Sequence, residues 1–99
     1  MRAKLTDDEI AQALASLPEW RRDGDALTRE FVFPSYMDGI AFVQRVAEAA
    51  EAADHHPDLF VGWRRVTCTL STHDAGGITQ ADVRLARQIE GIAGERAAD

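Results

Sequence analysis

The three prolines of this 99-residue chain, Pro18, Pro34 and Pro57, constrain its possible folds more than any other feature. Proline has no amide proton and disfavours helical conformation in the residue before it, so helices are expected to end before a proline or begin after one. Apolar residues at helical spacing stop before Pro18, resume after Pro34 and stop again before Pro57. The other segments carry strand patterns, so the sequence predicts one α+β domain over residues 1–99.

Capping signals mark the first and third expected helices. Thr6 and Glu9 have the spacing of a capping box, which starts a helix over residues 6–17. Its apolar face consists of Ile10, Ala13, Leu14 and Leu17. The third helix runs from Thr79 to about residue 92, with Asp82 at its third position. Its inward residues are expected to be Leu85, Ala86 and Ile89.

The second expected helix begins with Ser35 as its cap and ends near Asp54 or His55. Pro57 forces this ending because it disfavours helical conformation at His56. The apolar face is broad, with a stripe of Ile40, Val43, Ala47 and Ala50 flanked by Phe42, Val46 and Ala53. An adjacent pair of histidines is therefore expected at the C-terminus of this helix.

Four short strands are expected in the remaining segments. Residues 20–33 predict a hairpin that turns at Asp23-Gly24-Asp25. Residues 58–61 and 64–72 predict two more strands. Alternation in the longer one places Val66, Cys68 and Leu70 on one side and Thr67, Thr69, Ser71 and His73 on the other. His73 is thus expected at the strand end, on the polar face.

Composition excludes several function classes. A net charge of −6 would repel a phosphate backbone, so direct nucleic-acid binding is not expected. The chain lacks an apolar signal core near Met1 and a run of about 18 apolar residues, so we expect no membrane span and a cytoplasmic protein. The single cysteine, Cys68, has apolar strand parity and is expected to be a small buried residue.

All three histidines, His55, His56 and His73, fall within nineteen residues. Imidazole has an ordinary pKa of about 6.5, so a cluster can supply both an acid and a base near neutral pH. Glu51 lies one helical turn before His55, where its carboxylate could orient that ring. The negative end of the helix dipole also favours protonated imidazole at this position.

Structural roles compete with this interpretation. A single histidine often serves only in a structural hydrogen bond, and Asp82 is equally suited to capping its helix. The three histidines with Glu51 and Asp82 also resemble a set of metal ligands, but adjacent histidines rarely aim at one ion, so no metal is expected. No serine has a nucleophile-elbow motif, and Gly76-Gly77 is too short for a phosphate-binding loop.

The chain resembles the pterin-4a-carbinolamine dehydratase family along nearly its whole length. The motifs that carry this likeness are Glu51-x-x-x-His55-His56-Pro57, the aromatic Trp63, Thr72-His73-Asp74-Ala75-Gly76-Gly77 and Asp82. Further likeness lies in Leu17-Pro-x-Trp20, Leu27-x-Arg-x-Phe-x-Phe33, Phe42-x-x-x-Val46-Ala and Ile78-Thr-x-x-Asp82-x-x-x-Ala86. One departure is Arg64, where asparagine is common; it bears on oligomer contacts or local strand geometry.

The resemblance implies a four-stranded antiparallel sheet with three helices packed on one face. It implies dehydration of 4a-hydroxytetrahydrobiopterin to quinonoid dihydropterin, without metal or organic cofactor, in tetrahydropterin recycling. The implied catalytic residues are His55, His56 and His73, supported by Glu51 and Asp82, and the implied pterin-binding residues add Pro57, Thr72, Asp74 and Ala75. We expect His55 and His73 to transfer protons and His56 to bind.

The resemblance also bears on partners. Family members are dimers or tetramers, so a homodimer or homotetramer is expected, with a possible functional link to an aromatic amino acid hydroxylase. The alternative is a noncatalytic protein on the same fold, either a transcription-factor dimerisation cofactor or an assembly factor. Such a protein could lose its acid/base residues, whereas this chain retains all three histidines.

Overall fold

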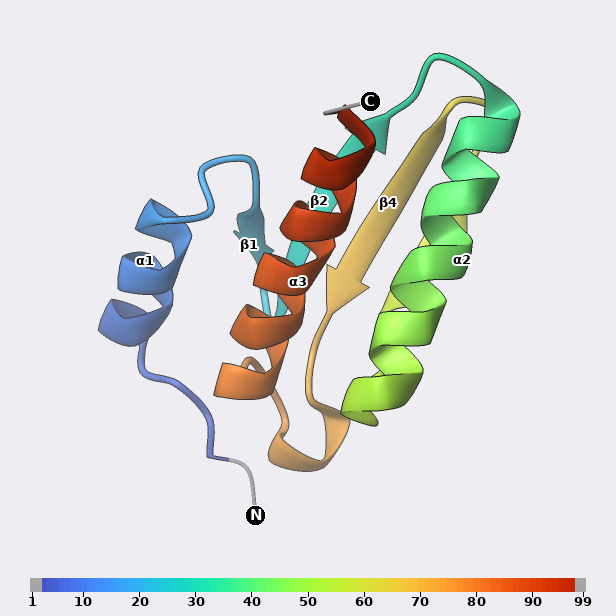
Figure 1. Cartoon of the computed structure of the whole chain (residues 1–99). Coiled ribbons are helices and arrows are strands. Elements are labelled where there is room, and N and C mark those ends of the chain that lie inside the picture. The colour runs from blue at the N-terminus through green and yellow to red at the C-terminus, as the bar shows by residue number, and fades with distance from the viewer. Residues whose placement is uncertain (1–2, 98–99) are drawn as a thin grey trace.

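The computed structural model describes residues 3–97. It contains a four-stranded antiparallel sheet in the order β1-β2-β4-β3, and three helices lie on one face of that sheet (Figure 1). The predicted fold class is therefore confirmed. None of the helices within the described residues is long and apolar enough to cross a membrane.

The first helix, α1 (Asp7–Ala15), begins as the sequence predicts. The Thr6 hydroxyl oxygen accepts a hydrogen bond from the Glu9 amide, and the Glu9 carboxylate accepts one from the Thr6 amide. These two hydrogen bonds form the capping box. The helix ends two residues earlier than expected, at a tight turn in which the Leu17 amide donates to the Leu14 carbonyl. Leu17 is still buried in the core.

The predicted hairpin is formed by β1 (Arg21–Asp23) and β2 (Ala26–Val32), with Gly24 at a positive φ of 59° in the turn. The strands β3 (Asp58–Val61) and β4 (Arg65–Leu70) pair with each other, and β4 also pairs with β2. The sheet side chains that face the helices are buried: Leu27, Phe31, Phe33, Val66, Cys68 and Leu70.

The second helix, α2 (Tyr36–Ala53), has the predicted Ser35 cap. The face that it buries differs from the expected stripe, since Ala47 is exposed and Ile40 and Val43 are only half-buried. The buried residues are Gly39, Phe42, Val46 and Ala50. The apolar set was broad enough for two registers, and the sheet takes the one in which Phe42 stacks between Phe31 and Phe33.

The third helix, α3 (Gln80–Ala97), follows the predicted Thr79 cap and continues five residues beyond the predicted end. The residues expected to face inward are buried, together with Val83. Glu90 contacts the Arg29 guanidinium and also accepts the Trp20 indole N–H at 2.8 Å. These contacts tie the middle of α3 to Arg29 of β2 and to Trp20.

Candidate active site

The end of α2 determines where the two adjacent histidines point. Asp54 adopts the left-handed conformation with φ 51° and ψ 43°, which is uncommon for a residue other than glycine. Its amide donates to the Glu51 carbonyl, and the His55 amide donates to the Ala50 carbonyl. This pattern is a Schellman motif, which turns the chain away from the helix axis. His55 and His56 therefore leave the helix in different directions.

His55 turns inward and meets Asp82 of α3. The distance from His55 Nε2 to Asp82 Oδ1 is 2.5 Å, and both side chains are buried. A carboxylate that contacts one ring nitrogen orients the imidazole and favours a single tautomer. His55 and Asp82 thus form a buried acid–base dyad that joins the ends of two helices.

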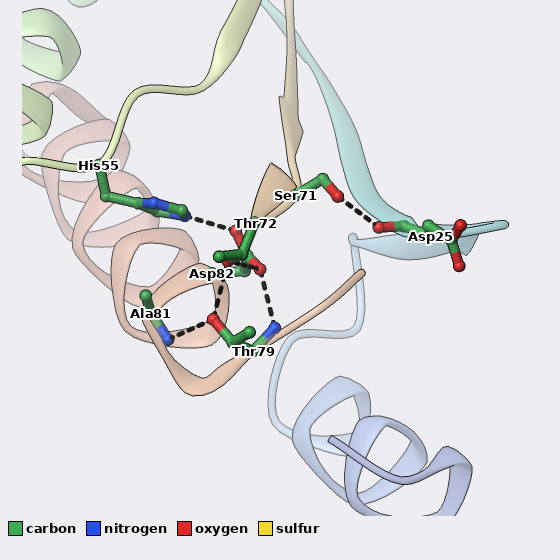
Figure 2. A network of polar contacts seen from close by, with 7 residues as sticks. All are labelled: Asp25, His55, Ser71, Thr72, Thr79, Ala81 and Asp82. Carbon is green, nitrogen blue, oxygen red and sulfur yellow. Dashed lines mark hydrogen bonds and ion pairs between the residues drawn. The ribbon is translucent and has the colours of Figure 1, made fainter. Parts of the chain in front are cut away.

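Asp82 is held by other groups on its second oxygen (Figure 2). Oδ2 accepts the Thr72 hydroxyl at 2.8 Å and the Thr79 amide at 2.8 Å. The two threonine hydroxyls are also 2.8 Å apart, and Thr79 Oγ1 accepts the Ala81 amide at 3.2 Å. The capping role and the site role that the sequence left open for Asp82 are therefore both present, one on each carboxylate oxygen.

His56 points outward and pairs with Glu51. Glu51 Oε1 lies 3.3 Å from His56 Nε2, and the two side chains are 78% and 56% exposed. The sequence assigned this carboxylate to His55 because it assumed that His55 continues the helix. The left-handed turn at Asp54 changes that geometry, so Asp82 is the partner of His55 and Glu51 is the partner of His56.

His73 lies in η1 (His73–Ala75), a short 3₁₀ turn, and is exposed. The predicted strand would have reached this residue, but β4 ends at Leu70. The turn is closed by Gly76, which has φ 75° and donates its amide to the His73 carbonyl. His73 is therefore presented at the tip of a turn rather than on a strand face.

These elements border an open pocket of about 310 Å³ that all three histidines line. Its lining residues are Asp54, His55, His56, Ser71, Thr72, His73 and Asp74. Asp54 and Ser71 are additions to the expected set, while Pro57 and Ala75 are not among the described residues that line it. The pocket can thus offer several imidazole nitrogens to one small, flat molecule.

A larger cavity, of about 850 Å³, lies against α3 and shares only His55, Thr79 and Ala81 with the network around Asp82. Its remaining lining is mostly alanine, leucine, glutamine and arginine, with no second histidine and no carboxylate. Proton transfer at neutral pH needs groups that can both donate and accept. The smaller histidine pocket is therefore the candidate site, despite its size.

Other kinds of chemistry have less support. Burial raises the pKa of the Cys68 thiol to about 12, so almost none of it is thiolate near neutral pH. Across the described residues, no group of three or more His, Cys, Asp or Glu side chains is arranged to hold a metal ion. The pocket groups that remain are suited to acid–base work.

Two features of the site were not predicted from the sequence. Thr79 was expected only to cap α3, yet its amide and hydroxyl both support the Asp82 network. Direct contact between Asp82 and His55 also went unpredicted, although a signal existed. The spacing of Thr79 and Asp82 places the carboxylate at the start of α3, where its Oδ2 accepts the Thr79 amide, and only a turn at Asp54 was needed to bring His55 to it.

Known proteins are similar to this chain along most of its length. The family model described as "Pterin 4 alpha carbinolamine dehydratase" matches residues 3–92. A protein of Mycobacterium avium (strain 104), named "Putative pterin-4-alpha-carbinolamine dehydratase", is 55% identical over 92 residues, which cover 93% of this chain and 98% of that protein. A protein of Thermomicrobium roseum with the same name is 50% identical over 91 residues, which cover 92% of this chain and 98% of that protein.

Solved structures give the same result. A Brucella melitensis protein described as a "transcriptional coactivator/pterin dehydratase" has a TM-score of 0.87 and 37% identity, over 91% of this chain and 98% of its own. A pterin dehydratase-like protein identified as a RuBisCO assembly factor in the alpha-carboxysome has a TM-score of 0.66 and 29% identity, over 77% and 90% of the two chains. By its sequence and its fold, this chain belongs to the pterin 4 alpha carbinolamine dehydratase family.

Proposed function

We propose that this protein dehydrates 4a-hydroxytetrahydrobiopterin, or a close pterin analogue, to quinonoid dihydropterin and water. The observation that carries the proposal is the single pocket in which His55, His56 and His73 meet. Membership of the family supports the same reaction class. The reaction removes a hydroxyl from C4a and a proton from N5, so it needs one acid and one base.

The proposed roles follow from burial and partners. His55, paired with the buried Asp82, takes the proton from N5 as the N5 lone pair forms the C4a–N5 double bond. His73, exposed at the tip of its turn, delivers a proton to the departing 4a-hydroxyl, which leaves as water. His56 binds the pterin ring, while Asp82 and Glu51 support the two adjacent histidines. The proton balance is closed without a further reactant.

We infer that catalysis needs neither a metal nor an organic cofactor, because imidazoles alone supply both proton transfers. Activity should therefore survive exhaustive treatment with a chelator and should not rise when zinc is added. Loss of turnover on chelation, with full recovery on addition of zinc, would contradict this proposal.

The cellular setting that we propose is cytoplasmic recycling of tetrahydropterin, linked to an aromatic amino acid hydroxylase. We also propose a homodimer or homotetramer. Large apolar side chains are exposed near the free edge of β3 and the starts of α2 and β4: Val32, Tyr36, Met37, Phe60, Val61 and Trp63. By contrast, the other sheet edge, β1, is short and exposes Arg21, Arg22 and Asp23. Apolar edges favour association, and charged ones oppose it.

A noncatalytic interaction protein is the second candidate. It is favoured by two structural relatives, one described as a transcriptional coactivator as well as a dehydratase and one as an assembly factor. The exposed apolar edge would serve such a role equally well. The two candidates differ in one property, because only the enzyme requires the histidine pocket.

Stopped-flow absorbance would test the proposed function. Freshly generated 4a-hydroxytetrahydropterin should decay faster with the wild-type protein, and its rate should return to the spontaneous value with a His55→Ala, His73→Ala double variant. Circular dichroism would establish that the variant is folded. A correctly folded wild-type protein that leaves the decay rate unchanged would favour the interaction protein.

A further inference from the structure

The larger cavity has no part in the proposed reaction, yet it has the size of a ligand site. Its volume of about 850 Å³ lies within the range of about 300–1,000 Å³ that is typical of small-molecule pockets. Three segments border it at one end of the molecule: the segment before α1, the end of α2 and the first turns of α3 (Figure 1). The cavity is therefore a product of the tertiary fold rather than of one local turn.

The segment before α1 is held in place as one wall of the cavity. The Leu5 amide donates to the Ile78 carbonyl at 2.9 Å, and Lys4 forms an isolated antiparallel bridge with Thr79. Leu5 is only half-buried, so part of its side chain remains accessible. Three small side chains complete the apolar lining on this side: Ala3, Ala53 and Ala81. These residues offer apolar surface and leave room for a ligand.

A row of polar side chains on α3 borders the same cavity. Its members are Gln80, Arg84, Arg87 and Gln88, and all four are exposed. Each of the other three lies three or four residues from Arg84, so the four side chains share one helix face. Arg87 donates to Ser16 Oγ at 3.3 Å. Within the part of the chain that the structure describes, the side chains of Gln80, Arg84 and Gln88 have no hydrogen bond or ion pair, so they can bind a ligand.

The larger cavity and the histidine pocket differ in charge. The larger cavity is lined by Arg84 and Arg87 and, among the described residues, by no carboxylate. The histidine pocket is lined by Asp54 and Asp74 and by no described lysine or arginine. His55 lines both, so the two are adjacent. An anion is thus favoured in the larger cavity and disfavoured in the histidine pocket, although the chain as a whole has a net charge of −6.

We propose that the larger cavity is a second ligand site, separate from the histidine pocket, and that it binds a small amphipathic carboxylate. The carboxylate accepts hydrogen bonds from the Arg84 guanidinium, whose planar N–H groups match its two oxygens, and the Arg87 charge lies beside it. The apolar body of the ligand packs against Leu5 and the three alanines. This inference does not depend on the proposed dehydration, because it concerns binding to the resting protein.

Titrations followed by amide NMR test the ligand class on the wild-type protein. The probe is 4-phenylbutyrate, and the matched compounds are 4-phenylbutan-1-ol, which lacks the charge, and inorganic phosphate, which lacks the apolar body. The carboxylate should give saturable shifts at the amides of Leu5, Ala53 and Ala81. Each matched compound should bind at least about tenfold more weakly, because it loses either the charge-assisted hydrogen bonds or the apolar contact.

A pair of double variants tests the role of the arginines. Arg84→Gln with Arg87→Gln should weaken 4-phenylbutyrate binding about tenfold or more, the effect of losing a hydrogen bond to a charged group. Arg21→Gln with Arg65→Gln is the matched control, since it removes the same charge from exposed strand positions outside the cavity. The control should bind like the wild type. Circular dichroism would establish that both variants are folded, and the comparison of the three compounds stands without them.

Several results would overturn the proposal. Absence of a saturable shift would mean that the cavity binds no such carboxylate. Equal affinity for the alcohol, or for phosphate, would show that the charge or the apolar body is not recognised. Shifts centred on His56 and His73 would place the carboxylate in the histidine pocket instead. Equal binding by the two folded double variants would show that Arg84 and Arg87 have no specific role.

Discussion

His55 and His56 are neighbours in the sequence and opposites in their surroundings. The His55 side chain is 7% exposed and paired with a fully buried carboxylate, whereas His56 is mostly exposed and paired with an exposed one. A buried pair is weakly screened and its geometry is fixed, while an exposed pair contributes little and is screened by salt. The carboxylate partner, more than the histidine itself, therefore determines what each ring can do.

The largest expected effect on stability comes from removing the two carboxylates in turn. Asp82→Ala leaves buried donors from His55, Thr72 and Thr79 unpaired, so unfolding free energy should fall by about 2–4 kcal/mol. Glu51→Ala breaks only an exposed pair and should change it by less than about 0.5 kcal/mol. Urea denaturation of both variants measures the difference. Equal losses in the two variants would remove the distinction between the pairs.

A smaller effect is expected at the turn that separates the two rings. Asp54 has a positive φ of 51°, which costs little for glycine and about 1–2 kcal/mol for most other residues. The free energy of unfolding of Asp54→Gly should therefore equal that of the wild type or exceed it by up to about 1 kcal/mol. In Asp54→Val it should be lower by about 1–2 kcal/mol. Denaturation midpoints check this order. A valine variant as stable as the glycine variant would show that the left-handed turn is not required.

The effect that is smallest near neutral pH concerns Cys68, a buried ionisable group for which burial is the dominant influence. Burial raises the pKa of its thiol from 9.0 to about 12, opposed by the nearby Arg29 charge and reinforced by Glu90. Between these values the unfolded chain loses the proton and the folded chain keeps it, so stability falls as pH rises. The contribution is at most about 1.4 kcal/mol per pH unit.

Cys68→Ala removes this contribution, so its stability should decline less steeply than that of the wild type between pH 9 and pH 11. Urea denaturation at several pH values gives both slopes. Parallel slopes would mean that the thiol ionises in the folded protein as readily as in the unfolded chain.

Local signals were sufficient for most of the fold. The Thr6, Ser35 and Thr79 caps, the hairpin turn at Gly24 and the end of the helix before Pro57 all lie where the sequence predicts them. Each of these depends on neighbours within a few residues, so a single sequence carries the information. The register of α2 was less predictable, because its broad apolar face allowed more than one way to pack.

The sequence predicted which histidines form the site, but it did not predict which carboxylate each of them contacts. All three histidines line one pocket, as their clustering suggested. The partner of His55 depends on a left-handed turn at Asp54, a residue type that gives only a weak signal for that conformation. It also depends on the packing of α3 beside the end of α2, which no local pattern encodes. Spacing along an ideal helix therefore predicted Glu51 as the carboxylate partner of His55, whereas the tertiary structure places Asp82 there.

The role of the buried His55–Asp82 dyad can be tested by comparing the turnover of Asp82→Asn and Glu51→Gln under identical conditions. Asparagine keeps the side-chain volume but presents an amide donor to His55, which reverses the tautomer, so turnover should fall by about 10²- to 10⁴-fold. Glu51→Gln should stay within about twofold of the wild type, because the pair that it alters is exposed. Equal losses, or a greater loss in Glu51→Gln, would contradict the claim that the buried dyad carries the proton transfer.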